Sequence, residues 1–83
     1  MKIKYDRKVA KYLTLLDRTT QKRIRAGIER IPQGDIVKLR GVEKGYRLRI
    51  GKFRVIFEIE DDIIYIDKIA SRGQVYKNRR KQG

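Results

Sequence analysis

The sequence predicts a two-layer α+β domain: an N-terminal strand, a two-helix hairpin and a three-stranded antiparallel meander. Between residues 7 and 31, apolar side chains recur every three or four positions, as they do on amphipathic helices. Between residues 46 and 70, apolar and polar side chains alternate, as they do on strands with one buried face. A chain of 83 residues suits one domain, so the helix pair is the only layer available to cover that face.

The chain begins with a strand and a capped helix. Lys2–Tyr5 alternates charged and apolar residues, and Asp6 is placed to cap the helix that follows. That helix, expected over residues 7–17, has Tyr12 beside an apolar stripe made of Val9, Leu13 and Leu16. It should run for about three turns.

A second helix is expected over residues 20–31, with Thr19 or Thr20 as its cap. Its apolar stripe consists of Ile24, Ile28 and Ile31. Gly27 lies within this stripe, and glycine in a helix interior costs about 1 kcal/mol. A packing role is therefore expected for Gly27, namely close approach of the first helix. The sequence Pro-Gln-Gly at 32–34 ends the helix pair.

The second half of the chain predicts the meander. Residues 35–45 read as a loop with one short extended piece at 37–39. Three strands follow, over residues 46–50, 53–59 and 63–70.

Two turns connect these strands. Gly51-Lys52 suits a two-residue turn of type II′, and Asp61-Asp62 is a weaker turn signal. This arrangement gives the sheet one apolar face, which consists of Leu48, Ile50, Phe53, Val55, Phe57, Ile59, Ile64 and Ile66.

The composition restricts the chemistry. Cysteine and histidine are absent, which removes disulfides, thiolate chemistry, the usual general base and the commonest metal ligand. The carboxylates lack ligand-like spacing, so we expect no metal site and no cofactor. No apolar run approaches the roughly 20 residues of a membrane span, and the N-terminus lacks the apolar stretch of a signal peptide. We therefore expect a cytoplasmic protein.

The charge predicts an anionic partner. The chain has 23 Lys and Arg against 10 Asp and Glu, a net charge of +13. This excess exceeds what solubility requires and favours a polyanion or an acidic protein as the partner.

The predicted hairpin at 46–59 places three arginines on one face. With Gly51 and Lys52 in the turn, Arg49 pairs with Arg54, and Arg47 follows on the same face. Like charges opposite one another destabilise a sheet, whereas guanidinium groups match phosphate in bidentate geometry. A solvated strand face is the simpler interpretation. The surrounding charge favours a binding face, because residues 38–54 contain seven basic residues and one acidic residue.

The run "VKLRGVEKGYRLRIGKFRVIFEIEDDIIYIDKIASRGQVYK" resembles the C-terminal half of RelE-type toxins of type II toxin–antitoxin systems. The matching pattern is Tyr-Arg-x-Arg-x-Gly-x-x-Arg-Val, an acidic turn, and a final Arg-x-x-Val-Tyr. The resemblance implies a RelE-like domain over residues 1–76. It also implies a metal-independent endoribonuclease that cleaves mRNA in the ribosomal A site through attack by the 2′-OH. Residues 77–83 include four basic residues and no apolar side chain, so we expect a basic and mobile tail there.

The resemblance also implies roles for individual residues. The basic pair of the family falls on Arg47 and Arg49, which with Arg54 would hold the scissile phosphate. Arg72 would serve the leaving 5′ oxygen, and Tyr76 would orient or stack on the nucleotide. Further basic residues extend the expected RNA-binding surface: Lys38, Arg40, Lys44, Lys52 and Lys77.

The sequence departs from the family pattern at the proton-transfer positions. Well-known members have lysine where this chain has Arg47 and Arg49, and arginine effectively cannot lose its proton. The proton acceptor is then a carboxylate such as Glu58, or water. Ser71 stands where many members have histidine or lysine, so we expect slower and more ribosome-dependent cleavage.

Two alternatives remain: a ParE-like inhibitor of DNA gyrase on the same fold, and a non-catalytic RNA-binding relative. The family implies an acidic antitoxin as partner, which would fold over the toxin. Operator DNA would be bound only through the toxin–antitoxin complex.

Overall fold

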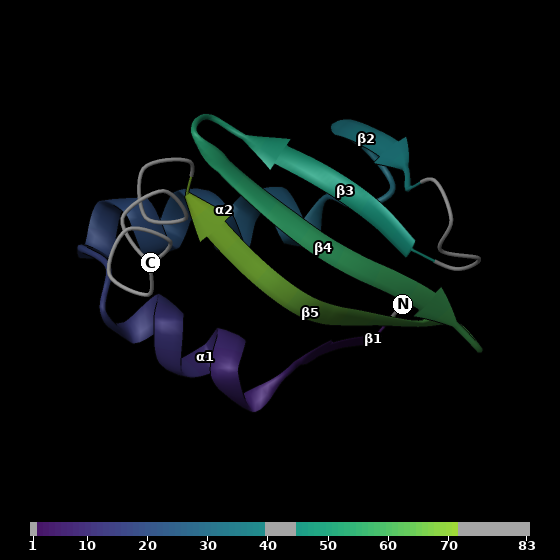
Figure 1. Cartoon of the computed structure of the whole chain (residues 1–83), viewed down its shortest axis with the longest axis horizontal. Helices are drawn as coiled ribbons and strands as arrows, with labels where there is room; N and C mark the ends of the chain where they lie inside the picture. Colours follow the sequence, from purple (N-terminus) through teal and green to yellow (C-terminus); the bar gives the residue numbers. More distant parts are fainter. Residues whose placement is uncertain (1, 40–44, 72–83) are drawn as a thin grey trace, which may run out of the picture.

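The computed structural model describes residues 2–39 and 45–71. It confirms the two-layer α+β architecture, with two helices against one face of a five-stranded sheet (Figure 1). The elements follow the predicted order, with one additional strand: β1 (Lys2–Tyr5), α1 (Arg7–Thr14), α2 (Arg18–Glu29), β2 (Asp35–Lys38), β3 (Gly45–Ile50), β4 (Phe53–Glu60) and β5 (Ile63–Ser71).

Both helices begin at an aspartate. Asp6 caps α1 as predicted, and its carboxylate accepts from the backbone N–H of Lys8 at 3.1 Å. The predicted threonine cap of α2 was wrong, because Asp17 takes that place and accepts from both the N–H (3.2 Å) and the hydroxyl (2.6 Å) of Thr20. These hydrogen bonds hold the pKa of Asp17 below its ordinary value. The helix therefore starts two residues earlier than predicted.

The helix α1 is shorter than predicted. It ends at Thr14, after about two turns, and Leu16 packs against the core from the connection that follows. Val9 and Leu13 are buried as expected.

The sheet has the strand order β1-β5-β4-β3-β2. The predicted meander is present as β3, β4 and β5, and β1 joins its outer side in parallel with β5. The segment 35–45 was predicted as a loop with an extended piece at 37–39. Its first four residues instead form β2, an antiparallel edge strand that pairs with β3.

Backbone conformation explains both predicted turns. Gly51 has φ 57°, in the left-handed region that a type II′ turn requires at its first central residue. Asp61 and Asp62 both have positive φ, 51° and 65°, which is the type I′ pattern. Aspartate tolerates this conformation better than most residues.

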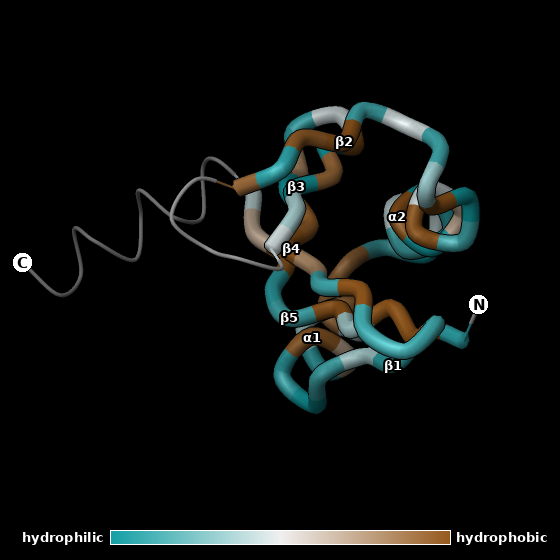
Figure 2. Tube along the Cα trace, turned by 90° about the vertical axis from the view of Figure 1, so that its right-hand side faces the viewer, coloured by the Kyte–Doolittle hydropathy of each residue, from teal (hydrophilic) through white to brown (hydrophobic). Residues whose placement is uncertain are grey.

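The core lies between the sheet and the helices, and Figure 2 shows α2 to one side of the sheet. Gly27 permits close packing, but against β3 instead of the first helix, because a Cβ there would lie 2.6 Å from Cδ1 of Ile50. The side chains of the core are Val9, Leu13, Ile24, Ile28, Ile31, Leu48, Phe53, Val55, Phe57, Ile64, Ile66 and Ile69.

An irregularity in β5 extends this core. Ile56 pairs with Lys68 and Phe57 pairs with Ile66, so Asp67 is an extra residue opposite β4. Such a bulge shifts the alternation of side chains. The shift returns Ile69 and Ser71 to the buried face after Ile66.

Candidate nucleic-acid interface on the open face

The face of the sheet that points away from the helices is called here the open face. Strand alternation and register assign to it Val37, Arg47, Arg49, Arg54, Ile56, Glu58 and Tyr65. The predicted register is confirmed, because Ile50 pairs with Phe53 and Arg49 pairs with Arg54. Arg47 pairs with Ile56, one position further along the same face.

Arg47, Arg49 and Arg54 form the arginine cluster. Side chains directly opposite one another in a ladder have Cβ atoms about 4.5–5.5 Å apart, so the side chains of Arg49 and Arg54 leave the sheet next to each other. Both side chains are exposed. Their mutual repulsion is relieved when an anion lies between them, which makes this pair a natural phosphate-binding element.

Arg47 is held more firmly than the other two arginines. Its side chain is only 22% exposed, and its neighbours across the strands are Val37 and Ile56. The Nε atom of Arg47 is buried and makes no hydrogen bond within the described residues. One of its terminal nitrogens lies 3.9 Å from a carboxylate oxygen of Asp35.

Asp35 is a member of this site that the sequence did not single out. It pairs directly with Arg49 on the neighbouring strand and forms the ion pair with Arg47. Sequence periodicity could not find it because β2 has only four residues. The β-branched pair Ile36-Val37, which begins two residues after Gly34, was the available signal for a strand.

A pair of carboxyl groups lies beyond Ile56 on the same face. Glu58 pairs with Tyr65, two residues before the bulged Asp67. Partial burial raises the pKa of Asp67 to about 6, and a hydrogen bond with Glu58 and the charges of Glu58 and Asp6 act in the same direction. Glu58 is the predicted candidate for proton transfer. Its neighbours are Tyr65 and Asp67, whereas Arg54 lies four residues away along β4.

The other predicted basic residues are placed differently. Lys38 pairs with Tyr46, whose ring stacks on Phe57 at 5.4 Å, so Lys38 alternates toward the helix side of the sheet. Lys52 lies in the turn, with its ammonium 5.8 Å from the centre of the Phe53 ring. Five predicted site residues lie outside the described residues: Arg40, Lys44, Arg72, Tyr76 and Lys77.

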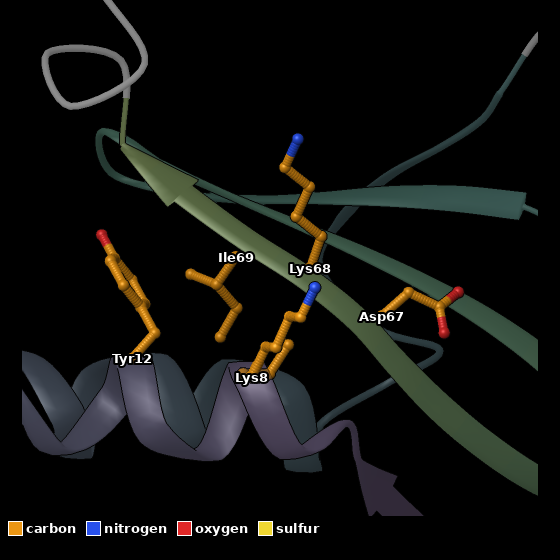
Figure 3. A pocket seen from close by; sticks show the side chains of 6 residues that line it. Lys8, Tyr12, Asp67, Lys68 and Ile69 are labelled. Atoms are coloured by element: carbon orange, nitrogen blue, oxygen red, sulfur yellow. The ribbon is translucent and has the colours of Figure 1, made fainter. Parts of the chain in front are cut away.

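A cleft of about 420 Å³ lies on the helix side, between α1 and the last part of β5. Figure 3 shows Lys8 and Tyr12 rising from α1 toward the strand, Ile69 pointing toward the helix, and Lys68 pointing to the opposite side of the strand. Burial raises the pKa of the Tyr12 phenol, and a hydrogen bond with Ser71 acts in the opposite direction. The cleft is therefore separate from the arginine cluster.

Residues 2–39 and 45–71 contain no group of three acidic side chains placed to hold a metal ion. No helix within these ranges has the length and hydropathy to cross a bilayer.

Comparison with known proteins agrees with this geometry. No family model matches the sequence. The toxin in the crystal structure of the archaeal RelE-RelB complex from Pyrococcus horikoshii OT3 is 31% identical, with a TM-score of 0.71, and the match covers 88% of this chain and 96% of that one. The chain belongs to the RelE toxin family.

Other RelE proteins support the fold. The RelB-RelE antitoxin-toxin complex from Methanococcus jannaschii gives a TM-score of 0.74 at 24% identity, over 90% of this chain and 96% of that chain. A free-state double mutant of the Escherichia coli toxin RelE gives a TM-score of 0.66 at 19% identity. The match covers 98% of this chain and 95% of that chain. A Methanocaldococcus jannaschii protein named toxin RelE1 is 50% identical over 46 residues, or 53% of this chain. This match spans about half the length (51%) of that protein.

Proposed function

We propose that this chain is the toxin of a type II toxin–antitoxin system and cleaves mRNA in the ribosomal A site. The observation that carries the proposal is the arginine cluster on the open face. Arg49 and Arg54 are opposed and exposed, and Arg47 is fixed beside them. This arrangement suits a phosphodiester better than a neutral ligand.

The reaction follows from what such a cluster does. The 2′-OH of the substrate attacks the adjacent phosphorus, the bond from phosphorus to the 5′ oxygen breaks, and a cyclic phosphate and a free 5′-OH result. Negative charge grows on the phosphoryl oxygens during the attack. Guanidinium groups already in place stabilise that charge without reorganisation, and they hold the nucleotide in line.

Proton transfer cannot use these arginines as bases. We assign the acceptance of the 2′-OH proton to water or to Glu58, the carboxylate that shares the open face. For Arg72 and Tyr76 we propose the roles that the family resemblance implies, at the leaving oxygen and at the nucleotide. A reaction without a strong base would depend on alignment of the mRNA by the ribosome.

The partner proposed for this toxin is an acidic antitoxin. The similar archaeal RelE proteins were crystallised in complexes with RelB, and a net charge of +13 favours an acidic segment as the ligand. The proposed location is the cytoplasm, where mRNA, ribosomes and the antitoxin are present together. Operator DNA would be contacted through the complex.

The test is mapping of 5′ ends on purified ribosomes programmed with a defined A-site codon. Arg54→Ala should reduce cleavage by about 10²–10³-fold. Arg18→Ala removes the same charge from the exposed start of α2 and should cleave as the wild type does. Equal cleavage by the wild type and Arg54→Ala would refute the phosphate-binding role.

Other outcomes identify the alternatives. If the wild type makes no cuts but stops the supercoiling activity of gyrase, the chain acts as a ParE-like toxin. If it binds RNA and does neither, it is a non-catalytic relative.

A further inference from the structure

The bulge in β5 determines which way Lys68 points. Ile64 and Ile66 are buried against the helices, so uninterrupted alternation would turn Lys68 toward the helices as well. Asp67 is the extra residue of the bulge and shifts the alternation by one position. The next buried side chain is therefore Ile69, and Lys68 lies on the open face.

Figure 3 shows the result of this shift. Lys68 points to the side of β5 that faces away from α1, whereas Ile69 points toward that helix. The side chain of Lys68 is exposed, and it forms no ion pair with any residue in the ranges 2–39 and 45–71. Bulges are common next to active sites, where they redirect a side chain. The Lys68 ammonium is thus available to an anion on the open face.

Lys68 is a neighbour of the arginine cluster. It pairs with Ile56 of β4, which pairs in turn with Arg47 of β3, so these three residues form one row across the sheet. Arg54 lies diagonally from Lys68, because the direct partner of Arg54 is Ala70. Diagonal neighbours have Cβ atoms about 7–8 Å apart, a distance that long side chains can span. The small side chain of Ala70 leaves space beside both cations.

The row Arg47-Ile56-Lys68 matches the repeat of a single RNA strand. Its two cations are on β3 and β5, whose backbones lie about 10 Å apart with β4 between them. The half-buried Ile56 offers an apolar surface between the cations. An RNA strand likewise presents two phosphates with a nucleoside between them, and proteins that grip single strands follow the phosphates with basic side chains.

We propose that Lys68 binds the phosphate next to the scissile one, so that the mRNA crosses the open face from β3 toward β5. This inference rests on the proposed function and adds an RNA-binding residue to it. The arginine cluster would hold the scissile phosphate, whose charge grows during the reaction. The flanking phosphate keeps its charge, so the point charge of a lysine is sufficient to hold it.

Lys68 has a simpler possible role as protection of a strand edge. β1 pairs with β5 at residues 63–66, and Lys68 lies beyond that stretch. Lysine at an exposed edge discourages pairing with another chain. That role requires no contact with RNA, so measurements of RNA binding distinguish the two.

The experiment compares two 2′-O-methyl oligouridylates, which cannot be cleaved, in NMR titrations. The dinucleotide has one phosphate, and the tetranucleotide has three. Lys68→Gln should weaken binding of the tetranucleotide about two- to fivefold and leave binding of the dinucleotide unchanged. It should also lower the salt slope for the tetranucleotide by about 0.7. Lys68→Arg keeps the charge and should bind both ligands as the wild type does.

Lys8→Gln is the matched control. Lys8 is exposed and lines the same cleft between α1 and β5, but its side chain rises from the helix side (Figure 3). This change removes the same charge a short way from Lys68, on the other side of the strand. It should leave the affinity for both oligonucleotides almost unchanged.

Three results would overturn the proposal. The first is a tetranucleotide that binds Lys68→Gln as it binds the wild type, or that does not bind the wild type at all. The second is equal weakening by Lys68→Gln and Lys8→Gln, which would indicate general attraction to a basic protein. The third is equal weakening of the dinucleotide and the tetranucleotide by Lys68→Gln, which would place Lys68 on the same phosphate as the arginine cluster.

The outcome can be separated from that of the proposed function, because the titrations need no cleavage. If the wild type cuts mRNA on ribosomes and Lys68→Gln binds the tetranucleotide normally, only the role of Lys68 is refuted. If Lys68→Gln weakens the tetranucleotide alone but the wild type makes no cuts, the chain binds RNA across the open face and the enzyme activity alone is refuted.

Discussion

The three arginines of the cluster differ in how much freedom they have. Arg49 and Arg54 are exposed, whereas the side chain of Arg47 is confined beside Val37 and Ile56 with its Nε buried and without a hydrogen bond. An unsatisfied buried donor costs about 1–3 kcal/mol. This cost is consistent with the proposed role of the cluster, in which a cation fixed in advance meets a developing negative charge.

A second residue-scale feature, the Asp67 carboxyl, leads to a prediction on pH. Its pKa is raised from 3.8 to about 6 in the folded protein, so the folded state binds a proton more tightly than the unfolded state does. The contribution of the protonated Asp67 carboxyl to the free energy of unfolding is therefore complete below about pH 3.8. It is lost as the pH rises through about 6. Asp67→Asn should therefore stabilise the protein at pH 7.5 relative to the wild type, and much less at pH 4.5.

Melting curves of the two proteins at both pH values measure this effect. Because Asp67 is exposed, solvent screens the interactions and the gain should stay below about 1 kcal/mol. Glu29→Gln, which removes one exposed carboxylate from α2, is the control. A difference between Asp67→Asn and the wild type that does not change with pH would contradict the prediction.

At the scale of the elements, the contact between α2 and β3 depends on Gly27. Valine at this position would place its Cβ within 2.6 Å of Ile50 Cδ1 and 3.1 Å of its Cγ1. Gly27→Val should therefore destabilise the fold by about 1–3 kcal/mol, the usual cost of overpacking. Urea denaturation should show a lower midpoint with the same slope.

Ala26→Val is the matched control for this substitution. Ala26 is the neighbouring residue of the same helix and is exposed, so its change should cost only helix propensity, below about 0.7 kcal/mol. Equal losses for the two variants would show that Gly27 has no special packing role.

Long elements of this fold could be predicted from the sequence, and short ones could not. The eight-residue β4 and the nine-residue β5 carry enough alternation to define their faces. The four-residue β2 forms because β3 offers it a partner along its length, which is not a local property. The cap of α2 was misassigned because Asp17 and the two threonines are all suitable cap residues, and only the backbone geometry selects among them.

The same contrast applies to the sites. The arginine cluster could be predicted, because a tight turn fixes which residues of a hairpin face one another. The cleft between α2 and the β2–β3 edge of the sheet could not, since tertiary packing alone brings Arg23 of the helix beside Leu48 and Ile50 of the strand. The placement of Lys38 away from the arginines follows from the register of β2, which the sequence did not define.

At the scale of the whole molecule, positive charge lies on both layers of the domain. The helix layer carries exposed basic residues such as Lys8, Lys11 and Lys22, and the arginine cluster lies on the opposite side of the sheet. The electrostatic field of the summed charges would attract RNA to either layer. Salt dependence distinguishes general attraction from defined phosphate contacts, because each contact releases counterions.

For single strands, each phosphate contact adds about 0.7 to the slope of log affinity against log salt concentration. Arg49→Ala should reduce the slope for a short 2′-O-methyl oligonucleotide, which cannot be cleaved, by about 0.7, and the double change with Arg54→Ala by about twice that. Lys11→Ala removes the same charge from α1 and should leave the slope almost unchanged. If Lys11→Ala reduced the slope as much as Arg49→Ala does, RNA would be held by the overall charge of the domain, and the arginine cluster would not be its phosphate site.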